Sequence, residues 1–183
     1  MRTAALVTIE EFERMAHGLG PCELVDGEIV AMSPGHFKHS RVTATVAFIL
    51  ETYARRSKHG RALTNEAGVV VSTERHTVRG ADAAFISYKR LPAGKECRGF
   101  LRQPPELVVE VLGVDDTWPG IEKKVSDYHG FGVDVVWVAD PRTLSVRVYP
   151  KRGEPYVLHE KDVIAGGKLL PGFQCRVSEF FVD

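Results

Sequence analysis

The stretch Pro105-Glu106-Leu107-Val108-Val109-Glu110-Val111-Leu112 is the most diagnostic part of this 183-residue sequence. Its near-continuous apolar run predicts a strand over residues 106–112 that is covered on both faces. An amphipathic helix is predicted over residues 117–130 and a second buried strand over residues 133–139. This strand, helix, strand order predicts an α/β fold in which helices pack on a mixed β-sheet.

The N-terminal part of the chain predicts a short helix followed by a hairpin. Thr8 and Glu11 have capping-box spacing for a helix over residues 8–17. Asp26-Gly27 is typical of a tight turn, so residues 22–32 are predicted to form a β-hairpin. The predicted fold is therefore the mixed sheet with an added N-terminal helix and hairpin.

The rest of the chain supplies one more long helix and several strands. Apolar residues at helical spacing predict a helix over residues 37–56. With no internal repeat and no evident linker, residues 1–183 are expected to form one domain. Further strands are predicted over residues 69–72 and 81–87, and around Val146, Tyr156 and Val163.

The composition is that of an ordinary globular protein without a charge bias. Hydrophobic residues make up 44% of the chain, and Lys plus Arg equal Asp plus Glu at 24 each. No overall field therefore steers the protein towards nucleic acid or a membrane. Binding to DNA would depend on a local basic patch, for which the candidates are Arg55, Arg56, Lys58 and Arg61.

The cysteines and the lack of long apolar segments point to the cytoplasm. Cys22, Cys97 and Cys175 are odd in number and far apart, which favours free thiols over a disulfide framework or a metal site. Residues 1–10 lack the apolar stretch of a signal peptide. No segment reaches the roughly 20 apolar residues that span a bilayer. We therefore expect a cytoplasmic protein without a membrane partner.

Glu110 is the residue that most needs a chemical explanation. It interrupts an apolar strand, where an ionised and unpaired carboxylate would cost several kcal/mol or more. It must be protonated, paired with a cation, bound to a metal, or close to a strand end that faces a cleft. Asp82 raises the same question on another predicted apolar strand. If the two strands are neighbours about 4.8 Å apart, both carboxylates can share one hard cation.

Lys124 is a candidate partner for these carboxylates. The apolar residues of the helix over residues 117–130 define its buried face at 100° per residue. Lys124 lies at the edge of this face, whereas Lys123 points to the opposite side. Lys124 can therefore extend its ammonium group towards Glu110, or extend it into solvent instead.

Glu23 and His39 complete the candidate set. His39 lies in the first turn of its predicted helix, on the apolar side, where a core or capping role is the common alternative to catalysis. Its HxxH spacing with His36 lacks a third ligand nearby, so no zinc site is predicted. Glu23 precedes two apolar residues of the hairpin, and its alternative role is ordinary exposure.

These residues carry a family resemblance that covers nearly the whole chain. The sequence resembles a large family of small bacterial proteins, first described as a domain of unknown function, within the PD-(D/E)XK nuclease superfamily of restriction-endonuclease-like folds. The matching stretches are Glu23-Leu24-Val25-Asp26-Gly27-Glu28, His39, Asp82, Pro105-Glu106-Leu107-Val108-Val109-Glu110-Val111-Leu112, Glu122-Lys123-Lys124 with Tyr128, Val136-Trp137-Val138-Ala139-Asp140-Pro141 and Leu169-Leu170-Pro171-Gly172.

The resemblance implies a restriction-endonuclease-like fold with a metal-dependent nuclease site. Asp82 would match the acidic residue of the PD element, and Glu110 the acidic residue of the second element. The lysine of the superfamily pattern follows that acid by two residues, where this chain has Leu112. The resemblance implies that Lys124 supplies the lysine from the following helix instead.

The activity implied by the resemblance is hydrolysis of phosphodiester bonds in DNA with Mg²⁺ or Mn²⁺. Two carboxylates and a main-chain carbonyl would hold the cation, and the lysine would orient the attacking water or stabilise the transition state. Two further residues match positions that line the same cleft and would assist proton transfer or contact the metal through water. The expected metal ligands are Asp82, Glu110 and the main-chain carbonyl near Val111. The expected lysine is Lys124, and the two further cleft residues are His39 and Glu23.

A non-catalytic function is the alternative. The fold would then serve as an oligomeric or nucleic-acid-binding module, and the acidic cluster would be a relic or a buried ion pair. In both cases we expect a homo-oligomer, most simply a dimer. The apolar tail Phe180-Phe181-Val182 is the expected contact with the second subunit.

Overall fold

The computed structural model describes residues 6–95 and 97–182. The α-helices are α1 (Ile9–Met15), α2 (Phe37–Ser57) and α3 (Trp118–Phe131), and two short 3-10 helices are η1 (Ala16–Gly18) and η2 (Val177–Phe181). The strands are β1 (Cys22–Val25), β2 (Glu28–Ala31), β3 (Gly60–Ser72), β4 (Thr77–Ser87), β5 (Leu107–Val111), β6 (Val135–Asp140), β7 (Ser145–Pro150), β8 (Tyr156–His159), β9 (Val163–Ala165) and β10 (Gln174–Arg176).

A mixed sheet forms the centre of the molecule. Its strands follow the order β2-β1-β4-β5-β6-β7-β8, with β3 paired to β4, while β9 and β10 pair separately. β5 and β6 run parallel and are connected through α3, and β4 is the antiparallel neighbour of β5 on the other side. The predicted α/β class with a mixed sheet is confirmed.

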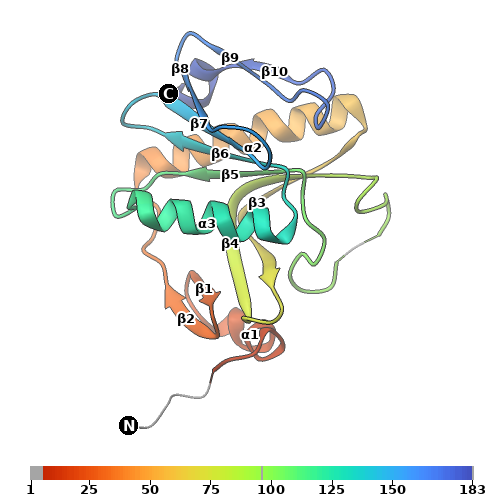
Figure 1. Ribbon diagram of the computed structural model, residues 1–183, viewed down its shortest axis with the longest axis vertical. Coiled ribbons are helices and arrows are strands. Elements are labelled where there is room, and N and C mark those ends of the chain that lie inside the picture. The colour runs from red at the N-terminus through yellow and green to blue at the C-terminus, as the bar shows by residue number, and fades with distance from the viewer. Residues whose placement is uncertain (1–5, 96, 183) are drawn as a thin grey trace.

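Helices cover both faces of this sheet. In Figure 1, α3 lies across the near face and α2 across the far face. Every residue of β5 is buried, which explains the apolar run that surrounds Glu110. Phe180 packs into the core on the α2 side. The expected contact of Phe180 with a second subunit is therefore wrong. Within the described part of the chain, no helix is long and apolar enough to cross a membrane.

The N-terminal helix and hairpin agree with their predicted signals. The Thr8 side chain accepts a hydrogen bond from the backbone N–H of Glu11, and the Glu11 side chain caps Thr8 in return. In the hairpin turn, Asp26 and Gly27 have φ values of 51° and 80°, as a tight turn between paired strands requires. These local signals correctly predicted α1, β1 and β2.

β3 and β4 form a hairpin much longer than the strands predicted over residues 69–72 and 81–87. A shift of register between Thr64 and Ala67 marks a bulge in β3, where Asn65 and Glu66 together lie opposite Asp82. Both bulge residues lie in the left-handed region, with φ of 65° and 55°. This polar bulge interrupts the apolar pattern, which is why the sequence did not indicate the first half of β3.

Candidate functional site

A cleft of about 380 Å³ opens beside the carboxyl end of β5. Its wall is built from the β1–β2 hairpin, the start of α2, the bulge of β3, β4, the loop after β5, and α3. The fold therefore brings together side chains that lie far apart in the sequence. All the predicted site residues line this cleft: Glu23, His39, Asp82, Glu110, Val111 and Lys124.

Glu110 lies in the floor of the cleft and is only 3% exposed. One carboxylate oxygen accepts a hydrogen bond of 2.7 Å from the Tyr128 hydroxyl, and the other lies 2.9 Å from Nζ of Lys124. Burial raises the pKa of Glu110 to about 7, although Lys124 opposes this shift and the negative charge of Asp82 adds to it. This carboxyl group is therefore poised to exchange a proton near neutral pH.

Lys124 is held between two carboxylates. Its Nζ lies 2.9 Å from Glu110 and 3.1 Å from Glu23. Burial opposes the charge on Lys124, but the attraction of Glu110 and Glu23 outweighs burial and raises its pKa. The lysine therefore stays charged, and the predicted contact with Glu110 is present.

Asp82 connects β4 to α2 and to the end of β5. One carboxylate oxygen accepts a hydrogen bond of 2.7 Å from the backbone N–H of Val111, and the other lies 3.2 Å from Nε2 of His39. The hydrogen bond to Asp82 raises the pKa of His39, against the effect of burial. His39 is thus a cleft residue whose protonated form is stabilised by Asp82, rather than an apolar core residue.

Glu23 belongs to a buried ion network that the sequence did not reveal. Arg79 donates to Glu23 at 2.7 Å and to Asp127 at 2.7 Å, and the backbone N–H of Gly80 donates to Glu23 at 3.0 Å. Asp127 lies on α3, three residues after Lys124. Arg79 therefore ties the hairpin residue that contacts Lys124 to the helix that carries Lys124.

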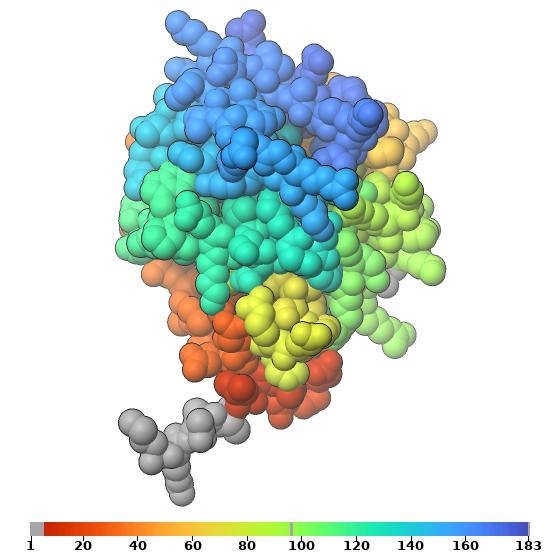
Figure 2. Space-filling view, viewed as in Figure 1, coloured from red at the N-terminus to blue at the C-terminus, as the bar shows by residue number. Residues whose placement is uncertain are grey.

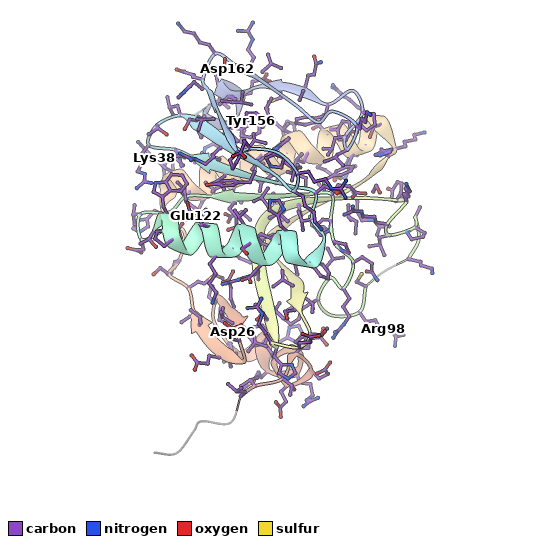
Figure 3. The ribbon with its side chains drawn as sticks, viewed as in Figure 1. Asp26, Lys38, Arg98, Glu122, Tyr156 and Asp162 are labelled. Carbon is purple, nitrogen blue, oxygen red and sulfur yellow. The ribbon has the colours of Figure 1, made fainter. Side chains whose placement is uncertain are left out.

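The network continues to the surface at the turns of the two hairpins. Arg75 donates to Asp26 at 2.7 Å and to Asp127 at 2.8 Å, and Lys123 lies 3.2 Å from Asp26. Figure 2 shows the orange β1–β2 hairpin and the yellow β3–β4 turn below α3 on this face, and Figure 3 labels Asp26 there. Lys123 therefore fastens the hairpin from outside and does not line the cleft.

Glu66 is a cleft residue that sequence reasoning missed. The bulge in β3 turns its side chain towards β4, where a Cβ at Gly80 would lie 2.7 Å from its carboxylate oxygen. Burial raises the pKa of Glu66, and the charge of Asp82 raises it further. Gly80 therefore leaves the space that the carboxylate of Glu66 occupies, and no apolar pattern in the sequence signals either residue.

Acidic groups dominate the electrostatics of the cleft. In the described part of the chain, no group of three or more His, Cys, Asp or Glu side chains is arranged to hold a metal ion. Asp82 nevertheless precedes Ala83 by one position and Glu110 follows Val109 by one, and Ala83 and Val109 are paired on adjacent antiparallel strands. Their oxygens are donors of the kind that hard cations such as Mg²⁺ prefer. The acidic residues that line the cleft are Glu23, Glu66, Asp82, Glu110, Asp115 and Asp116.

The basic patch expected to bind DNA lies far from this cleft. Arg55 is 16 residues beyond His39 on α2, which corresponds to about 24 Å along a helix axis. Arg55 also pairs with Glu51 at 2.7 Å, and Arg61 donates to backbone carbonyls of the loop after β4. These residues therefore do not border the cleft, and binding of DNA beside the cleft would need other cations.

Two comparisons relate the chain to known proteins. A model of the Uma2 family, described as "Putative restriction endonuclease", matches residues 9–178. The chain is also similar to a crystal structure of a putative nuclease belonging to DUF820 from Anabaena variabilis, with a TM-score of 0.80 and 18% identity over 96% of this chain and 97% of that chain. At this identity the likeness concerns the fold, and it confirms the predicted fold class. No curated protein matches the chain.

Proposed function

Since the chain belongs to the Uma2 family, as the resemblance in its sequence predicted, we propose that it is a metal-dependent endonuclease that hydrolyses phosphodiester bonds in DNA. The observation that carries this proposal is the position of Lys124 beside the buried Glu110, in the same cleft as Asp82. A lysine and two carboxylates on adjacent strands are the groups that this reaction needs.

The cation in this proposal is Mg²⁺ or Mn²⁺, held by Asp82, Glu110 and the main chain at Val111. The residues fit such an ion because they offer only oxygen donors and because Glu110 carries a burial penalty that a nearby cation relieves. When bound, the ion would lower the pKa of a water molecule and neutralise charge on the phosphate.

Lys124 and His39 supply the remaining chemistry in this proposal. The ammonium group of Lys124 faces the cleft and would offset the negative charge that develops on the phosphate as its bond to oxygen breaks. Glu23 also holds this ammonium group in place, at 3.1 Å. His39, whose pKa is raised by Asp82, would donate a proton to the departing oxygen.

The test is a cleavage assay on supercoiled and linear DNA with Mg²⁺ or Mn²⁺. The wild type should cut DNA, and Glu110→Gln should lose activity while remaining folded. Glu154→Gln is the matched control, because Glu154 is exposed and lies outside the cleft. If the wild type cuts no DNA with either ion and binds neither ion in calorimetry, the proposal is wrong.

A non-catalytic DNA-binding module is the second candidate function. It is favoured by the closed contact of Lys124 with Glu110 and Glu23, which satisfies these buried charges without a metal. This function predicts binding of DNA that needs no divalent ion and that survives Glu110→Gln. A gel-shift assay in the presence of a chelator separates it from the nuclease.

We also propose that the protein is a homodimer in the cytoplasm and that residues 1–183 form one domain. A twofold axis would let two identical clefts address the two strands of DNA. Phe37 and Phe48 of α2 are highly exposed and replace Phe180 as the candidate contacts. Light scattering of Phe48→Glu against the wild type tests the dimer, because a monomer in both samples would contradict it.

A further inference from the structure

A stacked pair of side chains, Trp118 and Arg147, lies beside the cleft and has no part in the chemistry described above. The guanidinium carbon of Arg147 lies 4.8 Å from the centroid of the Trp118 ring. Trp118 is 40% exposed. It is the first residue of α3 and follows the loop that lines the cleft. Arg147 forms no ion pair with any residue in 6–95 or 97–182, and its Nε is buried without a hydrogen-bond partner.

The register of the sheet places this pair close to the acidic centre. Glu110 pairs with Val138 on β6, and Val138 pairs with Arg147 on β7. Two strand spacings of about 4.8 Å separate the backbones of Glu110 and Arg147 by about 10 Å. Trp118 and Lys124 are separated by a similar distance, since Trp118 precedes Lys124 by six residues on α3, or about 9 Å along the helix axis. Figure 3 labels Glu122, one turn beyond Trp118 on this helix.

The charge of Arg147 complements what the cleft lacks. The cleft is acidic, and the lysines of α3 are already engaged, with Lys123 at Asp26 and Lys124 at Glu110. DNA binding needs cations that neutralise phosphates next to the one that is cut. Arg147 is a cation of this kind, and an exposed aromatic ring adds a surface on which a base can stack.

We propose that Trp118 and Arg147 bind an unpaired segment of a DNA strand next to the phosphate that is cut, with a base stacked on the pair and a phosphate contacted by Arg147. A base can stack on a side chain only when it leaves its own helix stack. The substrate is therefore DNA with a single-stranded or locally unpaired region, and this inference rests on the nuclease function proposed above.

Tryptophan fluorescence tests this proposal directly, because the chain has two tryptophans and the second, Trp137, is 2% exposed. The probe is a short single-stranded DNA oligonucleotide, compared with the same sequence as a duplex, in the presence of Ca²⁺. The single strand should quench the fluorescence saturably, and Trp118→Phe should remove the quenching. Quenching that persists in Trp118→Phe would come from Trp137 and would overturn the proposal.

Affinities of the variants follow from the anisotropy of a labelled oligonucleotide. Arg147→Gln and Trp118→Ala should each bind the single strand about 5- to 150-fold more weakly, the range that corresponds to one stacked base. Arg142→Gln is the matched control, because Arg142 is exposed on the neighbouring turn and pairs with Asp140. Equal affinity of Arg147→Gln and Arg142→Gln, or equal affinity of the wild type for duplex and single strand, would refute the proposal.

These measurements also separate this inference from the nuclease function. Quenching and tight binding of the single strand by a wild type that cuts no DNA with Mg²⁺ or Mn²⁺ would support the binding surface and reject the nuclease. Cleavage by a wild type whose tryptophan fluorescence is unaffected by DNA would support the nuclease and reject the surface. Thermal melting of each variant verifies that the substitution leaves the fold intact.

Discussion

The guanidinium group of Arg79 donates to the carboxylate of Glu23 at 2.7 Å, and their side chains are only 7% and 5% exposed. The other carboxylate oxygen of Glu23 lies 3.1 Å from Lys124, so one acidic residue divides its two oxygens between two cations. A lysine that is to face a phosphate must not be neutralised entirely by its own neighbours. Arg79 offsets the charge of Glu23 and so leaves more of the charge of Lys124 for Glu110 and the cleft.

Replacing Arg79 with Met should destabilise the protein by about 3–5 kcal/mol, because it leaves Glu23 and Asp127 buried without their shared cation. Urea denaturation measures this loss. Arg90→Met is the matched control, since Arg90 also joins two carboxylates but is more exposed and lies outside the cleft. At a temperature at which both variants are still folded, Arg79→Met should cleave DNA more slowly than the wild type, whereas Arg90→Met should not. Equal loss of activity in both variants would mean that Arg79 contributes to folding and not specifically to the site.

Lys124 and Lys123 are adjacent residues with opposite expected behaviour. Lys124→Ala should lower cleavage by about 10²–10³-fold, as expected when a charged group that stabilises a transition state is removed. Lys123→Ala should leave activity near the wild-type level and cost at most about 1 kcal/mol, because its pair with Asp26 is exposed. Cleavage rates and urea denaturation of both variants test these values. Activity lost equally in both variants would contradict the assignment.

The ionisation of Glu110 should make stability depend on pH in the absence of divalent ions. Burial raises its folded pKa from 4.5 to about 7, so the folded state binds this proton more tightly than the unfolded state does. The contribution of Glu110 to stability is therefore largest at low pH and is lost as the pH rises from about 4.5 to about 7. Urea denaturation across this range should show the loss in the wild type and not in Glu110→Gln. A constant difference between the two proteins would mean that Glu110 does not titrate there.

Binding of Mn²⁺ should raise the melting temperature of the wild type, because the ion binds only the folded site. At a free ion concentration of 100 times Kd, the stabilisation is about 2.7 kcal/mol. Glu110→Gln and Asp82→Asn should lose this shift, whereas Asp162→Asn, a change on the surface far from the cleft, should retain it. A shift of equal size in Glu110→Gln would place the ion elsewhere.

Much of the fold could be predicted because its signals are local. The apolar run around Glu110 predicted a covered strand, and β5 is buried throughout. The helix over residues 117–130 was predicted within a residue of α3, where the Thr117 side chain accepts a hydrogen bond from the backbone N–H of Gly120 and Gly132 ends the helix with φ of 119°. The first half of β3 was missed, because the bulge at Asn65 and Glu66 replaces the alternating pattern with polar residues.

From the sequence alone follow the α/β class, the burial of Glu110 and the choice of Lys124 over Lys123, since periodicity and hydrophobicity act over a few residues. Only the folded chain decides that Arg79 joins Glu23 to Asp127, that Glu66 enters the cleft, and that the cations near Arg55 stand away from it. These relations join residues tens of positions apart, through strand order and helix packing. Short-range sequence patterns do not indicate which distant residues come into contact. The charged neighbours of Glu110 are therefore determined by the tertiary structure.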